Sequence, residues 1–405
     1  MNYKILLLVL MTVKLIYKLI LTSIERRSYS NPIPENVKDV YDDETYKKWR
    51  EYSAEKLKPE LISILVSTFV TFVLICLNAH ACFAKLFGSG VYAEALGVVI
   101  IDSLIGELVS LPFSYIDTMK IEEKYGFNRS TAKTFWSDFA KSTVISLILS
   151  TGLVMLLALV HEWLGNWMAL AFAIILFVIV MFISFIYPFL SKIFNKFTPL
   201  EEGELKTRLT ALLAKYGYTV RAINVMDGSR RSTKSNAYFT GFGKTKTIVL
   251  YDTLLASSTD DEICAVFAHE MGHGLNKDTL KNQLISFINI ALIAVAAFVT
   301  VSFPEIYKCF GFENVNYAFA IILVGEELSI ISPLMNLLTS WYSRRAEYRA
   351  DAQTVKEGLG DAQISVLKKL ARQNFAHLSP SPIIVKLTYS HPTISQRIET
   401  IEKLK

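Results

Sequence analysis

The chain has 405 residues, of which 52% are hydrophobic and only 20% are charged, and its formal net charge is +5. This composition is too apolar for an ordinary soluble protein of this length and indicates a polytopic membrane protein. The basic residues form no patch with interleaved aromatic residues, so we expect no nucleic acid among its partners.

Seven stretches are long and apolar enough to cross a bilayer, which takes about 20 residues each. They lie near 3–22, 61–83, 92–115, 143–160, 167–187, 284–303 and 317–341. The first carries Lys14 and Lys18 within it, and the third carries Asp102 and Glu107. The first also resembles a secretory signal, but charged residues end it and no small-residue cleavage site follows, which favours an uncleaved anchor.

The basic residues alternate between the two sides of these spans. They are frequent after the first, third and fifth spans and in the C-terminal tail, whereas the loops after the second and sixth spans hold only Lys85 and Lys308. By the positive-inside rule, the N-terminus lies outside and the long segment 188–283 and the tail lie in the cytosol. The four cysteines have no paired spacing, so they indicate neither disulfides nor a cysteine-ligated zinc site.

The segment 188–283 has the pattern of a small α+β unit. A helix is expected over Glu201–Tyr216, followed by strands around 222–226, 236–239 and 247–251, separated by glycine-containing turns. A further helix then leads into the sixth span. The tail 342–405 is predicted to be helical, with a last helix that opens at His391-Pro392 and repeats isoleucine along one face.

The helix before the sixth span contains the sequence His269-Glu270-Met271-Gly272-His273. The two histidines lie one helical turn apart on one face, so both imidazoles can bind one metal ion. Glu270 lies beside them as a candidate general base. An H-E-x-x-H helix is typical of zinc sites that hydrolyse peptides, although such a sequence also arises by chance on solvated helices.

Glu347 is the best candidate for a third zinc ligand. Asp351 lies four residues further on the same helical face and could orient a ligand histidine from outside the coordination shell. The alternative for Glu347 is a surface salt bridge with a neighbouring arginine. Cys264 is about 140° round the helix from His269 and is predicted to be a small core residue.

The expected topology favours Glu347 as a ligand. The sixth and seventh spans form an antiparallel hairpin, with His273 about 16 Å of helix before the hairpin and Glu347 about 9 Å after it. Both therefore reach the same membrane face. The chain divides into helices 1–187, a cytosolic α+β part 188–283, the hairpin 284–341 and a helical C-terminal part 342–405.

Six short motifs, in this order and with seven spans, resemble the type I CAAX prenyl proteases, which are integral-membrane zinc endopeptidases. The resemblance covers nearly the whole chain. The motifs are IEEKYGFN at 121–128, FNKFTPL at 194–200, SNAYF at 235–239, HEMGH at 269–273, SRRAEYRAD at 343–351 and SHP at 390–392.

The resemblance implies roles for particular residues. His269, His273 and Glu347 match the zinc ligands, with one zinc per chain, and Glu270 matches the general base. Asn236 and Ala237 match an edge strand that binds extended substrate, His391 a residue that helps to stabilise the oxyanion, and Arg397 a residue near the substrate carboxylate.

In two places the chain departs from the family pattern. The segment between Thr253 and Asp261 is short, where some relatives have a charged insertion. Asp278 stands where relatives often have another histidine. Neither is expected to touch a ligand.

The family fold is a ring of seven helices around a large water-filled chamber, closed by the protease domain. The resemblance therefore implies a mainly α fold with a small α+β zinc metalloprotease domain. It also offers a place for five carboxylates near membrane depth, which are otherwise costly there. The alternative is that they are protonated or paired in a tight bundle. They are Glu94, Asp102, Glu107, Glu326 and Glu327.

The expected function is zinc-dependent proteolysis near the C-terminus of isoprenylated CAAX proteins, with Glu270 as general base. The membrane would be the endoplasmic reticulum in a eukaryote or the inner membrane in a bacterium, with the active site toward the cytosol and a substrate whose prenyl group lies in the bilayer. Two alternatives stay open: a broad-specificity quality-control protease of membrane proteins, and a transporter, which would not need Glu270. The oligomeric state is left open.

Overall fold

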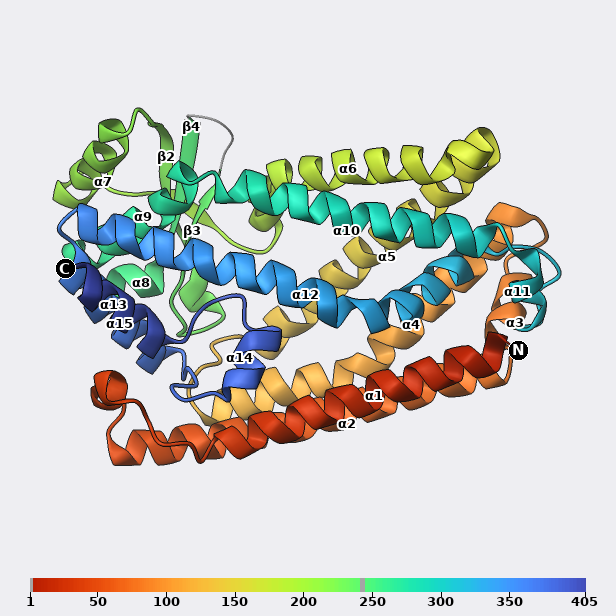
Figure 1. Cartoon of the computed structure of the whole chain (residues 1–405), viewed down its shortest axis with the longest axis horizontal. Helices are drawn as coiled ribbons and strands as arrows, with labels where there is room; N and C mark the ends of the chain where they lie inside the picture. Colours follow the sequence, from red (N-terminus) through yellow and green to blue (C-terminus); the bar gives the residue numbers. More distant parts are fainter. Residues whose placement is uncertain (1–2, 241–244) are drawn as a thin grey trace.

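The computed structural model describes residues 3–240 and 245–405 and consists mainly of helices. Long helices run the length of the molecule, and a small sheet with short helices caps one end (Figure 1). The seven longest in this part of the chain are α1 (Tyr3–Ser28), α2 (Asp43–Cys76), α4 (Val91–Ile116), α5 (Ala132–Leu164), α6 (Met168–Leu190), α10 (Asp278–Val301) and α12 (Tyr317–Lys356).

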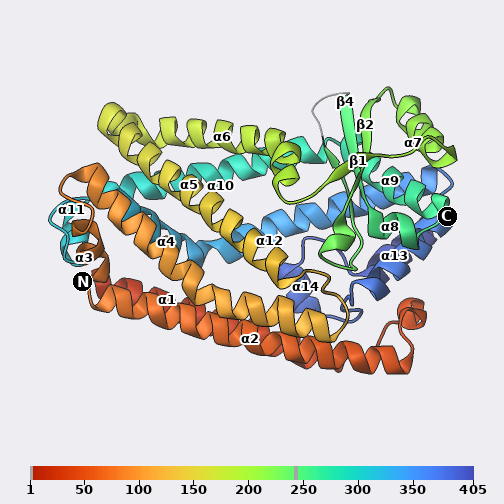
Figure 2. The same ribbon diagram turned by 180° about the vertical axis from the view of Figure 1, so that it is seen from behind.

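These seven helices close into a ring. In ring order, α1 packs on α2, α2 on α4, α4 on α5, α5 on α6, α6 on α10, α10 on α12, and α12 on α1. Figure 2 shows the same arrangement from behind. The largest apolar core lies at the end that carries the short helices α3 (Ala79–Lys85) and α11 (Pro304–Lys308), where Tyr307 and Phe319 are fully buried.

Six stretches of the described residues have the length and hydropathy needed to cross a membrane. One of them, Ala132–Ser184, contains α5 and most of α6, which the 3-10 turn Gly165–Trp167 separates. The mainly helical membrane fold is confirmed, whereas the number of seven crossings stays a prediction.

Helix α12 presents two unlike faces within its apolar part. Large apolar side chains recur at Ile331, Leu334, Leu338 and Trp341, and Leu334 is 66% exposed. At about 100° per residue, exposed Ser332 and Asn336 lie on the opposite side of the helix. Such a helix packs one face toward lipid and turns the other toward the inside of the ring.

Among the described residues, three of the five membrane-depth carboxylates have a side-chain partner. Glu326 pairs with Lys14 at 2.9 Å, Asp102 lies 3.0 Å from His80, and Glu327 accepts hydrogen bonds from Tyr3 and Thr300. A polar cavity of about 260 Å³ lies between α1, α2 and α12 around the first of these pairs. Pairing therefore accounts for these three, and the large chamber stays a prediction.

A four-stranded sheet forms the α+β part. Its order is β1 (Phe197–Pro199), β2 (Thr219–Met226), β4 (Thr245–Tyr251) and β3 (Ala237–Thr240). β2 and β4 are parallel, and β3 pairs with β4 antiparallel, with Ala237 opposite Leu250. Helices α7 (Glu204–Lys215), α8 (Asp252–Ser257) and α9 (Asp260–Leu275) bury a common apolar core with the sheet. The three predicted strands and the helix near 201–216 are observed, and β1 was missed because it has only three residues.

The C-terminal helices are α13 (Gly360–Gln373), α14 (Pro382–Thr388) and α15 (Ile394–Leu404). The prediction that the last helix opens at His391-Pro392 is wrong. Thr393 caps α15 through a reciprocal pair of hydrogen bonds with Gln396, so the helix begins at Ile394. His391 therefore lies in the segment before α15 and not in the first turn of the helix.

The C-terminal helices share a core with the segment between α1 and α2 and with the start of α2. Trp49 is 1% exposed and donates from its ring nitrogen to the carbonyl of Phe375 at 3.1 Å. The hydroxyl of Tyr41 donates to the carbonyl of Ala371 at 2.9 Å. Residues 37–49 and the C-terminal helices therefore contribute to one apolar core.

Candidate metal centre

Helix α9 is fixed at its start by a capping box. The Thr259 amide donates to Glu262 at 2.8 Å, the Glu262 amide donates to the Thr259 hydroxyl at 3.3 Å, and acidic residues fill the first turn. Glu262 also pairs with Lys369 of α13 at 2.6 Å. Ile263, Phe267 and Met271 bury the apolar face, so the face bearing both histidines turns toward α12.

Gly272 permits the close approach of α9 to α12. A Cβ atom at this position would lie 2.8 Å from the Cα atom of Ala350 and 3.0 Å from the Cβ atom of Gln353. Real Cβ atoms do not come this close, so any larger residue would force the two helices apart. The glycine within H-E-x-G-H thus sets the distance between the histidines and the carboxylates of α12.

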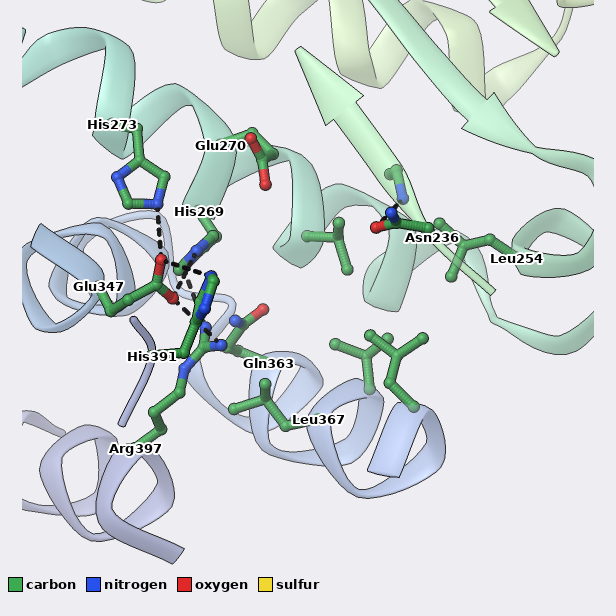
Figure 3. A pocket seen from close by; sticks show the side chains of 14 residues that line it. Asn236, Leu254, His269, Glu270, His273, Glu347, Gln363, Leu367, His391 and Arg397 are labelled. Carbon is green, nitrogen blue, oxygen red and sulfur yellow. Dashed lines mark hydrogen bonds and ion pairs between the residues drawn. The ribbon is translucent and has the colours of Figure 1, made fainter. Parts of the chain in front are cut away.

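His269, His273 and Glu347 converge between these helices (Figure 3). One ligand atom from each lies within 4.8 Å of the others. The Nε2 atom of His269 is 3.5 Å from Glu347 Oε2, and the Nε2 atom of His273 is 3.3 Å from Glu347 Oε1. The hairpin of α10 and α12 brings them together, as the sequence predicts.

A carboxylate engages the other nitrogen of each histidine. His269 Nδ1 lies 2.9 Å from Asp351 Oδ1, and His273 Nδ1 lies 3.1 Å from Asp278 Oδ2. Each carboxylate fixes the ring orientation and leaves Nε2 as the free donor atom, which is the usual arrangement around metal-bound histidine. Asp351 is 0% exposed, so the carboxylate that holds the His269 ring is itself fixed by the surrounding core.

The donor set fits a metal ion. Two imidazole nitrogens and one carboxylate suit zinc and related transition metals. Glu347 is 4% exposed, and its buried Oε2 atom has no hydrogen-bond partner among the described residues. Burial opposes charge on His269, but its hydrogen bonds to Asp351 and Glu347 raise its pKa to about 9. The two carboxylates therefore favour positive charge at the position of the His269 ring.

Glu270 lies beside the three converging side chains. It lines the same cavity of about 360 Å³ and makes no hydrogen bond or ion pair within the described residues. Its carboxylate is therefore available to a molecule in the cavity. Cys264 is buried in the core under the sheet, as expected of a residue that is not a ligand.

Arg397 is buried rather than solvated. It is 8% exposed, and it donates to Asp351 from Nε at 2.9 Å and from Nη2 at 2.7 Å. Its Nη1 atom lies 3.3 Å from Glu347 Oε2. Gln363 also donates to Asp351, at 3.2 Å. The guanidinium thus neutralises and orients the two carboxylates of α12.

His391 and the edge strand complete the cavity wall. His391 is 63% exposed in its side chain, and its Nε2 atom lies 3.3 Å from Glu347 Oε1. Asn236 and Ala237 lie at the start of β3, at the edge of the sheet, and line the same cavity. Leu254, Val266 and three residues of α13 add apolar side chains to the lining of this cavity; the three are Val366, Leu367 and Leu370.

The expectation that Asp278 touches no ligand is wrong. Its Oδ2 atom meets His273, and its Oδ1 atom accepts from the Tyr342 hydroxyl at 2.9 Å and from Arg349 Nη2 at 2.7 Å. Although burial alone would raise the pKa of Asp278, the hydrogen bonds from Arg349, His273 and Tyr342 lower it. Lys277 adopts a left-handed φ of 56°, which turns the chain from α9 into α10 and folds Asp278 back onto the histidine.

Comparisons with known proteins match the whole of this architecture. Residues 25–196 match the CAAX prenyl protease N-terminal region of five membrane helices, and residues 199–405 match peptidase family M48. CAAX prenyl protease 1 of Saccharomyces cerevisiae is 31% identical over 403 residues, covering 91% of this chain and 88% of the yeast protein. CAAX prenyl protease 1 homolog of Arabidopsis thaliana is 30% identical over 386 residues, covering 91% and 90%. The crystal structure of S. mikatae Ste24p superposes with a TM-score of 0.93 at 29% identity and covers 99% of both chains.

The contact between Asp278 and His273 predicts a loss of metal affinity in Asp278→Ala. Removing the carboxylate frees the ring of His273, which is expected to weaken zinc binding about 10–100-fold. Asp278→Asn keeps an acceptor without the charge, so its zinc affinity is expected to lie between that of the wild type and that of Asp278→Ala. Competition with a chromogenic chelator measures both, and Asp260→Ala, at the exposed start of α9, serves as control. Unchanged zinc affinity in Asp278→Ala would contradict the assignment.

Proposed function

The chain belongs to peptidase family M48, and we propose that it is a zinc-dependent membrane endopeptidase that cuts near the C-terminus of isoprenylated CAAX proteins. The observation that carries this proposal is the convergence of His269, His273 and Glu347 beside an unpartnered Glu270. The chain is an integral multi-pass membrane protein by its apolar helices and its family. Its relatives named CAAX prenyl protease 1 supply the substrate class.

The proposed metal is zinc, one per chain. His269, His273 and Glu347 would hold it through Nε2, Nε2 and a carboxylate oxygen. When bound, zinc supplies a Lewis acid that polarises a carbonyl oxygen and lowers the pKa of water toward neutrality. Asp351 and Asp278 accept from the Nδ1 atoms, which orients both imidazole rings and leaves each Nε2 to face the metal.

We assign the proton transfers to Glu270. As a free carboxylate in the cavity, it accepts the proton of the attacking water and then delivers this proton to the leaving amine. His391 is close enough to Glu347 to face the reacting carbonyl and to donate a hydrogen bond to the developing oxyanion. Arg397 is assigned to holding Asp351 and Glu347 rather than to the substrate carboxylate, because its guanidinium is already occupied.

The substrate would bind as an added strand along β3. Asn236 and Ala237 lie at the start of β3, the edge strand, whose outer side pairs with no further strand among the described residues and could pair with an extended peptide. The apolar wall of α13 would receive a side chain next to the cleaved bond. A prenyl group in the bilayer would then anchor the same substrate at the membrane surface.

A pair of peptides tests this function. Purified enzyme should cleave a farnesylated CAAX peptide much faster than the same sequence without the lipid, because only the former concentrates at the membrane site. Glu270→Gln should keep zinc but lose about 10²–10⁴-fold in turnover, because an amide cannot accept the proton. Equal cleavage of both peptides would instead support a broad-specificity protease, and more than a tenth of the activity in Glu270→Gln would remove Glu270 as the base.

We also propose that the active site faces the cytosol, from the alternation of basic loops. In a variant whose four native cysteines are replaced by serine, single cysteines at Lys308, Glu201 and Lys403 report the two sides. A membrane-impermeant maleimide applied to sealed membrane vesicles with their cytosolic face outward should label Glu201→Cys and Lys403→Cys, and should label Lys308→Cys only after permeabilisation. Labelling of Lys308→Cys in the sealed vesicles, with Glu201→Cys protected, would reverse the orientation and make cytosolic prenylated substrates untenable.

A further inference from the structure

A second pocket, distinct from the metal centre, lies between α12 and α14. Its volume is about 300 Å³, and Trp341, Arg344 and Arg345 of α12 face Lys386 of α14 across it. Helix α14 packs on α12 and also contacts α1, so the pocket lies on the ring near the end that carries the sheet (Figure 1). The mechanism proposed above uses none of these residues.

The pocket carries positive charge that no acidic residue neutralises. Arg344, Arg345 and Lys386 all line it, whereas none of its lining residues is Asp or Glu. None of these three cations has an ion-pair partner in residues 3–240 and 245–405. Arg344 donates only to the backbone carbonyls of Val385 at 3.1 Å and Tyr389 at 2.6 Å. The guanidinium of Arg345 lies 4.1 Å from the centre of the Trp341 ring. An anion in the pocket would therefore meet three uncompensated cations.

The pocket lies where the apolar face of α12 ends. Leu334, Leu338 and Trp341 are 66%, 63% and 49% exposed, and Arg345 follows on the same stripe at helical spacing. A stripe of exposed leucines that ends in Trp and Arg is typical of a lipid-facing helix at the level of the phospholipid headgroups. Glu347 points to the other side of the helix, with the polar face, toward the metal centre.

We propose that this pocket binds the headgroup of an anionic membrane phospholipid. The phosphate lies among Arg344, Arg345 and Lys386, and an acyl chain follows the stripe of Trp341 and Leu338. The combination of basic side chains with an adjacent exposed apolar stripe matches a lipid better than a soluble anion, which would gain nothing from the stripe.

A second basic groove among the described residues is a poorer candidate. The cavity between α2 and α4 also has three lysines, but Glu51 and Glu55 line it, and Lys124 is paired with Glu55 at 2.7 Å. Its charge is largely neutralised within the protein. The α12–α14 pocket therefore offers the stronger attraction for an anionic headgroup.

The lipid site adjoins the segment that carries His391. Arg344 is one turn before Glu347 on α12, and it holds the end of α14 through the carbonyl of Tyr389. The chain then continues through Ser390 to His391. A headgroup bound here would sit at the membrane surface beside the proposed active site, and its binding does not depend on that proposed function being correct.

Native mass spectrometry of the full chain in detergent tests the site. We compare the affinity for dioleoyl phosphatidylserine with that for dioleoyl phosphatidylcholine. The test variant is Arg345→Gln with Lys386→Gln, which leaves the structural Arg344 in place. The control is Lys47→Gln with Lys48→Gln, which removes the same charge from exposed positions on α2 that have no contact with the pocket. Melting temperatures verify that each protein is folded.

The wild type and the control variant should bind one phosphatidylserine more tightly than phosphatidylcholine. The pocket variant should bind it about 30-fold more weakly, since each interfacial Lys or Arg contributes about 1 kcal/mol. Equal phosphatidylserine affinity in the pocket variant and the control would overturn the proposal. It would also be overturned if phosphatidylcholine bound equally well, or if glycerophosphoserine without acyl chains competed as strongly as the lipid.

Discussion

The structure of the site depends on one buried contact, in which the carboxylates of α12 face the two histidines of α9. A carboxylate removed from water is costly unless charged and hydrogen-bonding groups compensate it. Glu347 and Asp351 are both almost fully buried, and the two histidines and Arg397 surround them. Gly272 lets α9 approach α12 closely enough for this compensation. The hairpin of α10 and α12 then holds α9 and α12 in register.

Each of the two histidines contacts a carboxylate that is itself bound by an arginine. His269 meets Asp351, which in turn accepts from Arg397, and His273 meets Asp278, which accepts from Arg349. In each chain of contacts, the arginine keeps the carboxylate ionised and the carboxylate sets the ring nitrogen that remains free. The residues of these two series of contacts come from different elements. The site therefore forms only when α9, the start of α10, α12 and α15 are all in place.

The sequence predicts the parts of this site that depend on helical spacing. The i,i+4 pair of His269 and His273 and the i,i+4 pair of Glu347 and Asp351 follow directly from the helix period, and the apolar hairpin brings the two pairs together. Asp278 could not be placed in this way, because its position depends on the left-handed turn at Lys277. The burial of Arg397 depends on where α15 packs, and that helix begins after the predicted His391-Pro392 start because Thr393 and Gln396 form its capping box.

A chelator titration of two variants tests the central claim most directly, because it separates the ligand from its outer partner on one helix. Glu347→Ala and Asp351→Ala are each loaded with zinc and titrated with a competing chelator of known affinity. The account predicts that Glu347→Ala loses zinc affinity by orders of magnitude, whereas Asp351→Ala loses about 10–100-fold. If Asp351→Ala stripped the metal while Glu347→Ala retained it, the two roles would have to be exchanged and the geometry described here for the metal centre would be contradicted.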